Sequence, residues 1–82
     1  MIEYSNNNTY VTISNENITR ELFQNDNEII KVIIDSDVIS VENNAFQNFS
    51  SLEEVIIKET VETFGSDVFS DYSITIISNE AK

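Results

Sequence analysis

Apolar residues recur along this chain at an interval of 23 residues, and the clearest set is Phe23, Phe46 and Phe69. A shift of the sequence by 23 superposes further apolar positions, whereas the polar residues between them do not coincide. Because buried positions are constrained more strongly than exposed ones, the pattern predicts about three repeats that stack around one interior. The other coincident sets are Val11, Ile34 and Ile57; Ile18, Val41 and Phe64; Leu22, Ala45 and Val68; Ile29 and Leu52; and Val32 and Val55.

Each repeat is expected to contain two extended segments. Residues 32–35 and 55–58 are short runs of β-branched residues, which favour strands. The alternating apolar residues that follow, such as Val38 and Val41, predict a second extended segment. Equivalent strands of stacked repeats pair in parallel, because the rest of each repeat supplies the long connection that parallel pairing needs.

A short helical turn is predicted after the second extended segment, at residues 43–49 and again at 66–72. Apolar residues in the first of these turns stand at positions i, i+1 and i+4, so they share one face of a helix. Gly65 precedes the second turn, where a positive φ angle would cost little. The candidate helix N-caps are Asn43 or Asn44 in one repeat and Ser66 or Asp67 in the next.

The stretch VIIDSDVISVENNAFQNFSSLEEVIIKETVETFGSDVFSDYSITI resembles the BspA-type leucine-rich repeat, whose unit joins a strand to the pattern V..IG..AF..C..L..I.I. Asp35 and Lys58 stand where that family usually has proline, and Phe49 and Tyr72 stand where it has cysteine. The resemblance implies a leucine-rich-repeat fold and a role in binding proteins or matrix. The residues that carry it are Val38, Val41, Ala45, Phe46, Phe49, Leu52, Val55 and Ile57 in one copy, and Val61, Phe64, Gly65, Val68, Phe69 and Tyr72 in the next.

The pattern and the resemblance together predict an α/β repeat solenoid of short parallel strands and short helical turns, in one small domain over residues 1–82. Residues 1–13 are predicted to form an N-terminal cap, about residues 10–77 the repeats and residues 78–82 a tail. In residues 2–13, extended residues flank an asparagine run, which predicts a β-hairpin, because asparagine tolerates the left-handed backbone of a tight turn. Residues 74–77 are expected to form an edge strand, which either offers a homodimer contact or stays single as a short twisted edge.

An outward apolar ladder is the main candidate for a binding surface. If Val32 and Ile34 point inward, Ile33 points outward, because strand side chains alternate. The same reasoning places Ile56 and Tyr10 in the ladder, with Ile77 as an extension. The predicted partner-binding residues are Tyr10, Ile33 and Ile56 with the acidic residues Asp35, Glu54 and Glu59. Two alternatives stay open: the β-branched residues stand there simply because they favour strands, or the hairpin covers the ladder.

The charge is strongly acidic, with 15 acidic and four basic residues and a net charge of −11. Such a chain repels nucleic acid and anionic membranes and attracts basic partners. If the acidic residues line one surface, they can imitate a row of phosphates; otherwise they form an ordinary solvated surface. Those concerned are Asp35, Asp37, Glu42, Glu53, Glu54, Glu59, Glu62, Asp67 and Asp71.

Composition removes much of the usual catalytic chemistry. The chain has no cysteine and no histidine, so it offers no thiolate nucleophile, no imidazole base and no common zinc ligand. The run DSDVISVE lacks the glycine and the oxygen spacing of an EF-hand calcium loop. We therefore expect no cofactor, no metal and no enzymatic activity. No secretion signal or long apolar run occurs, so a cytoplasmic location is expected if Met1 is the native start.

The sequence favours a non-enzymatic protein-interaction module, an acidic inhibitor or adaptor that binds a partner protein through the surface of the solenoid. One alternative is an acidic mimic of nucleic acid that blocks a nucleic-acid-binding defence protein, as an anti-CRISPR of a phage or mobile element would. Another is a repeat segment of a bacterial surface adhesion protein.

Overall fold

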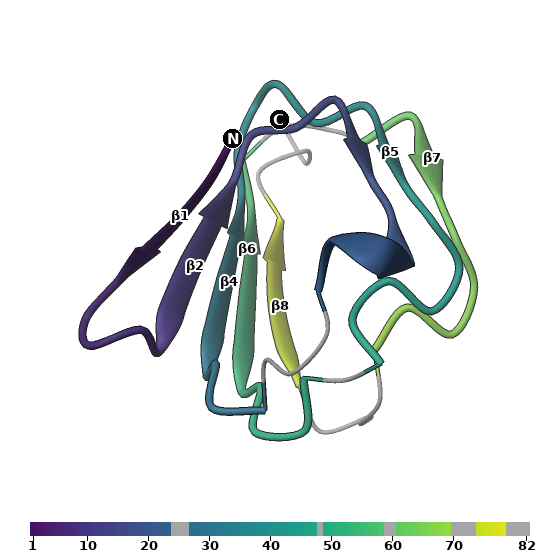
Figure 1. Cartoon of the computed structure of the whole chain (residues 1–82). Coiled ribbons are helices and arrows are strands. Elements are labelled where there is room, and N and C mark those ends of the chain that lie inside the picture. The colour runs from purple at the N-terminus through teal and green to yellow at the C-terminus, as the bar shows by residue number, and fades with distance from the viewer. Residues whose placement is uncertain (24–26, 48, 59–60, 70–73, 79–82) are drawn as a thin grey trace.

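The computed structural model describes residues 1–23, 27–47, 49–58, 61–69 and 74–78, and these form two sheets (Figure 1). The first sheet has the strand order β1-β2-β4-β6-β8, and the second has the order β3-β5-β7. The elements are β1 (Ile2–Ser5), β2 (Tyr10–Ile13), β3 (Asn17–Ile18), the 3-10 turn η1 (Arg20–Leu22), β4 (Lys31–Ile34), β5 (Ser40–Val41), β6 (Glu54–Ile57), β7 (Thr63–Phe64) and β8 (Thr75–Ser78).

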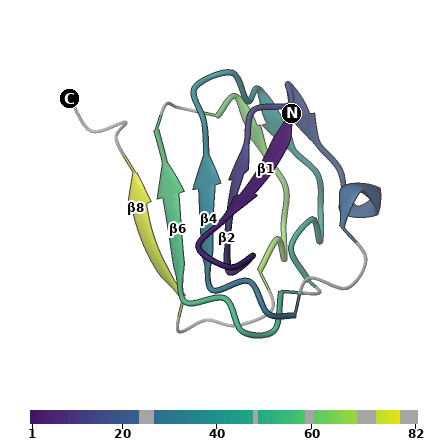
Figure 2. The same ribbon diagram turned by 60° about the vertical axis from the view of Figure 1, so that its left-hand side comes forward.

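The chain passes alternately through the two sheets, so that each passage makes one coil of the stack. The first coil holds β2 and β3, the second β4 and β5, and the third β6 and β7, while β8 begins a fourth. All strand pairs between successive coils are parallel, as predicted. The stack of coils is therefore strand-rich, and its interior lies between the two sheets (Figures 1 and 2).

The interval between paired residues in the first sheet is not constant. Val11 pairs with Val32, Val32 pairs with Val55, and Val55 pairs with Ile76. The first and the last of these intervals are two positions shorter than the middle one, so the expected pairing of Val11 with Ile34 is wrong. A displacement of two positions keeps each side chain on the same face of the sheet, so the buried positions of this sheet were still predicted correctly. Two other superposed apolar positions are not buried, because Leu22 is 37% exposed and Phe64 is 40% exposed.

The predicted superposition of the three phenylalanines is confirmed. The ring centroids of Phe23 and Phe46 are 5.6 Å apart, and those of Phe46 and Phe69 are 5.5 Å apart with an angle of 6° between the ring planes. Phe49 stands edge-on to Phe46, with centroids 5.0 Å apart and an angle of 87°. Phe46 is fully buried. Stacked and edge-on contacts of this kind stabilise aromatic pairs beyond the burial of area.

The alternation of buried and outward residues in the strands is also confirmed. In β4, Val32 and Ile34 are buried while Ile33 is only half-buried, and β6 repeats this alternation. The interior contains no buried polar or charged residue among those described. The core consists of Val11, Ile13, Ile18, Phe23, Ile29, Val32, Ile34, Val38, Val41, Ala45, Phe46, Phe49, Leu52, Val55, Ile57 and Val68.

The turn predicted at residues 43–49 is present, but its described residues form no helix. Gln47 N–H donates to the carbonyl of Asn44, as in a β-turn, whereas Phe46 N–H donates to the carbonyl of Val68 in the next coil, at 2.8 Å. Asn44 has a φ angle of 62°, in the left-handed region, which interrupts a right-handed helix. Within the described residues, η1 is the one helical element, so the α/β class was too helical a description.

The role predicted for Gly65 is also wrong, since its φ angle is not positive. A Cβ atom at this position would lie 2.5 Å from the backbone nitrogen of Asn43 and equally close to its Oδ1. Gly65 is therefore needed for the close approach of two coils. Asn43 Oδ1 accepts a hydrogen bond from Ser66 N–H at 2.8 Å, and Asp67 has a φ angle of 52°, so the proposed N-caps are turn residues and not helix caps.

The N-terminal hairpin is confirmed. β1 pairs antiparallel with β2, and Asn6, Asn7 and Asn8 between them have φ angles of 55°, 59° and 67°. Ile2 packs against the core from this added strand. The hairpin therefore adds a strand to the first coil at the start of the stack.

The opposite edge of the first sheet belongs to β8. This strand pairs with β6 on one side and has no strand on the other among the described residues, as expected for an edge. The second helical turn, predicted at residues 66–72, and the tail, predicted at residues 78–82, lie partly outside the described residues.

Candidate functional site: the outward face of the first sheet

The outward face of the first sheet carries three rows of side chains, which follow from the strand register and its continuation in backbone hydrogen bonds. We call this surface the sheet face, and we call Ile33, Ile56 and Ile77 the isoleucine row. The first row is Tyr10, Lys31, Glu54 and Thr75; the central row is Glu3, Thr12 and the isoleucine row; and the third row is Ser14, Asp35 and Lys58.

The isoleucine row is an apolar strip between two polar rows. Ile33 and Ile56 are half-buried, and Ile77 is 48% exposed. The N-terminal hairpin does not cover the strip, because β1 pairs with the edge of β2 and so extends the sheet sideways (Figure 1). The hairpin therefore leaves the strip open to contact.

Tyr10 does not stand in the isoleucine row, which corrects the predicted ladder. It pairs with Lys31, and Thr12 is the residue beside Ile33. The error has a simple cause: the first coil is two positions shorter than the interval that was applied to it. An alignment of YVTI with KVII by their shared valine and last isoleucine would have found the register and, with it, Thr12 and Lys31. The predicted extension by Ile77 is confirmed, because Ile77 pairs with Ile56.

Lys31 links three strands at one end of the sheet face. Its Nζ lies 5.1 Å from the centroid of the Tyr10 ring and 3.8 Å from Oε1 of Glu54. An exposed ion pair contributes little to stability, but it fixes the positions of the charges beside the apolar strip. Tyr10 and Glu54, both predicted to contact a partner, thus lie together in the first row.

Charges on the sheet face nearly cancel. Among the described residues, its carboxylates belong to Glu3, Asp35 and Glu54 and its ammonium groups to Lys31 and Lys58, which leaves a net charge of −1. Most of the acidic surplus of the described residues therefore lies off this face.

The remaining described charges lie elsewhere on the molecule. Glu42 accepts a hydrogen bond from the backbone N–H of Arg20 at 3.2 Å, and Glu16 and Glu62 flank the second sheet. The predicted contact residue Glu59 lies outside the described residues, as does Asp71. The acidic residues beyond the sheet face are Glu16, Glu21, Glu28, Asp37, Glu42, Glu53, Glu62 and Asp67, and the basic one is Arg20.

Comparison with known protein families agrees with the coil geometry. The model described as the BspA type leucine-rich repeat region (6 copies) matches residues 3–82, nearly the whole chain. The chain belongs to the BspA-type leucine-rich repeat family. None of the curated proteins and none of the solved structures matched it. Repeats of this family are typically non-enzymatic modules for protein interaction, which is the class of function that the sequence favoured.

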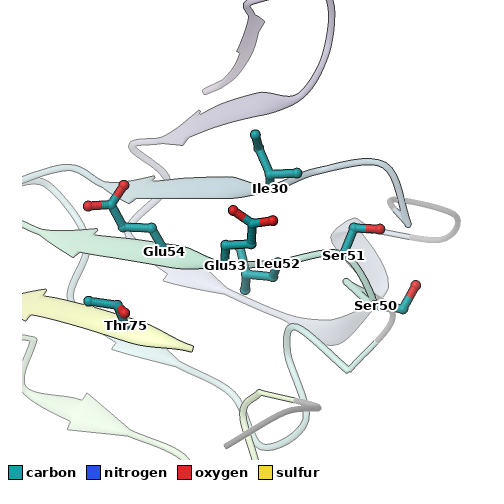
Figure 3. A pocket seen from close by; sticks show the side chains of 7 residues that line it. All are labelled: Ile30, Ser50, Ser51, Leu52, Glu53, Glu54 and Thr75. Atoms are coloured by element: carbon teal, nitrogen blue, oxygen red, sulfur yellow. The ribbon is translucent and has the colours of Figure 1, made fainter. Parts of the chain in front are cut away.

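In this leucine-rich repeat chain, a hollow of about 740 Å³ opens beside the starts of β4, β6 and β8 (Figure 3). Glu53 and Glu54 both line it, yet Figure 3 shows their carboxylates apart from each other, and Glu54 is already engaged by Lys31. The hydroxyls of Ser50 and Ser51 also reach the hollow, but the chain has no histidine to act as their base. The arrangement gives no acid–base pair to build a reaction on.

Two further findings concern metal ions and membranes. Among the described residues, Asp and Glu side chains nowhere gather in the groups of three that hold a metal ion. The described part of the chain also has no helix of the length and apolar character that crossing a membrane requires.

Proposed function

We propose that this chain is a protein-interaction module that binds its partner through the sheet face. The observation that supports the proposal is the isoleucine row, an apolar strip with polar rows on both sides, on a sheet face that the N-terminal hairpin leaves open. Protein interfaces are commonly built in this way, with a dry apolar centre that supplies most of the binding energy and a polar rim that excludes water and sets orientation.

The partner that fits the sheet face presents apolar side chains flanked by charges of both signs. Lys31 and Glu54 stand on one side of the strip, and Asp35 and Lys58 stand on the other. A strongly basic partner is the alternative, and it would have to bind the carboxylates that lie off the sheet face. The same distribution disfavours a mimic of nucleic acid on the sheet face, because a row of uncompensated carboxylates is missing there.

We further propose that the chain is a stacked-coil solenoid. It acts either as an inhibitor or adaptor of another protein or as a repeat segment of a surface adhesion protein. Both use the sheet face in the same way. They differ in what the partner is, and in whether further repeats accompany this one in the native protein.

The test compares two double variants for their ability to retain a partner from the source cell. Ile33→Asp with Ile56→Asp places two carboxylates in the isoleucine row. Leu22→Asp with Ile39→Asp is the matched control, because these residues are 37% and 42% exposed and lie outside the sheet face. We expect the first variant to lose a partner that the wild type and the control retain, and to keep the β-sheet signal in circular dichroism.

Two results would refute the proposal. If the first double variant unfolds while the control does not, the isoleucines belong to the core and the assignment of the face is wrong. If it stays folded and retains the same partner as the wild type, binding takes place elsewhere. In that second case, retention that falls steeply as salt is raised would indicate that the partner binds the carboxylates off the sheet face, since interactions between exposed charges are screened.

A further inference from the structure

Four charged side chains stand at the corners of a rectangle around the two central isoleucines of the sheet face. On one side of the isoleucine row, Lys31 of β4 lies beside Glu54 of β6, with Nζ and Oε1 3.8 Å apart. On the other side, Asp35 follows β4 and Lys58 follows β6, and the N–H of Lys58 donates to the carbonyl of Ile34. The signs therefore alternate around the rectangle, and we call these four residues the charge rectangle.

The charge rectangle is neutral in a chain that has few cations. The sequence has 15 acidic and four basic residues, and two of the four basic residues stand in the rectangle. Two copies of the chain, each with a net charge of −11, repel each other where their surplus carboxylates meet. On the sheet face, by contrast, the described charges leave a net charge of only −1, so two copies can approach there with little local repulsion.

The charge rectangle becomes complementary to itself about a two-fold axis that runs parallel to the strands, between β4 and β6. These two strands lie side by side (Figure 2). Rotation about the axis lays two sheet faces against each other and puts β4 of one copy opposite β6 of the other. Lys31 then faces Glu54 of the second copy, and Asp35 faces Lys58 of the second copy. Each of these contacts occurs twice because of the symmetry, and the central isoleucines of the two copies also face each other.

An axis perpendicular to the strands is less favourable. It also brings opposite charges of the rectangle together, but it lays each strand on its own equivalent in the second copy. Glu3 of β1, in the central row, would then face Glu3 of the second copy, and like charges that oppose each other disfavour a contact. The axis parallel to the strands avoids this repulsion, because it places β1 of one copy beyond β8 of the other.

We infer that the sheet face binds a second copy of this chain about the axis parallel to the strands. The inference rests on the proposed function, since it names the partner of the same surface. The partner that fits the sheet face presents apolar side chains flanked by charges of both signs, and the sheet face itself carries this pattern. Facing sheets pack about 10 Å apart, a distance that the long side chains of Lys31 and Glu54 can bridge beside the isoleucines.

The dimer turns one ion pair into a closed group of four charges. Within each copy, Lys31 already lies beside Glu54, and in the dimer each of them also meets its opposite across the contact. An isolated exposed ion pair contributes little to stability, whereas a network of several charges contributes more. On the other side of the isoleucine row, the carboxylate of Asp35 accepts a hydrogen bond from the N–H of Ser36 at 2.7 Å, which helps to fix its position.

The size of the contact predicts a weak dimer. Four strands of the first sheet, about 4.8 Å apart, and about five residues of about 3.3 Å along each strand give a face of roughly 300 Å² per copy. A standard protein interface buries about 800 Å² per partner. We therefore expect a dissociation constant on the order of 1 mM, which is within the range of concentrations that NMR and sedimentation can use.

The deciding experiment exchanges charges between two variants of the full chain. Lys31→Glu puts carboxylates opposite each other in the dimer, and Glu54→Lys puts ammonium groups opposite each other. Each variant alone should associate at least about tenfold more weakly than the wild type. In an equal mixture, every charge at positions 31 and 54 of one variant faces its opposite in the other. The mixture should therefore form dimers at least about tenfold tighter than those of either variant alone.

The matched controls reverse charges off the sheet face. Arg20→Glu alters the net charge as Lys31→Glu does, and Glu62→Lys alters it as Glu54→Lys does. Arg20 and Glu62 are both exposed, so their variants should fold. We expect each control, alone or mixed with the other, to associate like the wild type. Sedimentation measures the mass and the dissociation constant, and circular dichroism verifies that every variant is folded.

NMR of the unmodified chain maps the contact without any substitution. The amide signals of Ile33 and Ile56 should shift as the concentration is raised toward about 1 mM, where about half of the chains pair. Ile39 is the internal control, because it is 42% exposed and lies off the sheet face, so its amide signal should not shift. If a charge variant fails to fold, these shifts and the mass of the wild type decide.

A wild type that stays monomeric at about 1 mM overturns the inference. A mixture of Lys31→Glu and Glu54→Lys that associates no more tightly than either variant overturns it as well, as does a dimer that Ile33→Asp with Ile56→Asp leaves intact. If the wild type is monomeric while this double isoleucine variant loses a different protein from the source cell, the inference fails and the proposed function stands. The two failures are therefore distinguishable.

Discussion

Replacing Phe46 by alanine is the most direct test of the stacked interior. Phe46 is fully buried, and its ring lies within 5.0–5.6 Å, centroid to centroid, of the rings of Phe23, Phe49 and Phe69. The substitution removes the ring at the point where three coils meet. No neighbour can fill the space without leaving its own aromatic contacts.

The expected loss of stability in Phe46→Ala is large for a molecule of this size. Truncation of a buried phenylalanine costs about 3–5 kcal/mol, because both transfer energy and packing around the cavity are lost. At about 0.05–0.15 kcal/mol per residue, a chain of 82 residues has a free energy of unfolding of about 4–12 kcal/mol. We therefore expect Phe46→Ala to remove most of the stability, or all of it if the wild type lies at the lower limit.

Phe64→Ala is the matched control, because it deletes the same ring at a position that is 40% exposed. Full burial of a phenylalanine is worth about 1.5–3 kcal/mol, so partial burial predicts a loss of about 1–2 kcal/mol. Urea unfolding followed by circular dichroism gives both values. The chain has no tryptophan, so circular dichroism is preferred to fluorescence.

The difference between the two variants is the decisive quantity. If Phe46→Ala and Phe64→Ala cost the same within about 0.5 kcal/mol, the aromatic stack does not form the centre of the interior. If Phe46→Ala is unfolded without urea, measurement in an osmolyte such as sucrose restores a measurable transition, since excluded osmolytes strengthen burial.

Two further substitutions test the backbone. Gly65→Ala should lower stability by about 1–3 kcal/mol, since the added Cβ would lie 2.5 Å from the backbone nitrogen of Asn43; a melting temperature equal to that of the wild type would contradict the close approach of the coils. Asn44→Val should cost about 1–2 kcal/mol in urea unfolding, because a β-branched residue resists a φ angle of 62°, whereas Asn44→Gly should cost less; the opposite order would argue against the left-handed turn.

The repeat in the sequence predicted the interior well, because burial constrains residue type strongly. Phe23, Phe46 and Phe69 superpose, and the in–out alternation of β4 and β6 is as expected. The hairpin was predicted from the asparagine run, since few other residues tolerate three successive left-handed positions. In each case one local physical requirement selects the residue type.

The neighbours on the sheet face were harder to predict, because they depend on the lengths of the corners. In the first coil, the step from the core position Val11 to Ile18 is two positions shorter than the equivalent step from Val32 to Val41 in the second. The segment that connects the two sheets within a coil can vary in length with little effect on the apolar pattern. The sequence therefore placed Tyr10 on the correct face but beside the wrong residue, and missed Thr12.

The helical turns and Gly65 show a second limit. The apolar spacing in residues 43–49 fits a helix, but Phe46 N–H bonds to the next coil and not to its own turn. Local periodicity carries no information about a partner in another coil. In the same way, a single glycine does not reveal whether it is needed for its φ angle or, as at Gly65, for the absence of a Cβ.

The described charges are distributed unevenly between the sheet face and the rest of the molecule. The sheet face has a net charge of −1, while the remaining described residues carry eight carboxylates and one guanidinium group. Near a cationic surface, such as an anion-exchange resin or a basic membrane protein, we expect the molecule to turn the carboxylates that lie off the sheet face toward that surface. The isoleucine row then faces the solution, so adsorption by charge presents this surface in one orientation and leaves it ready for contact.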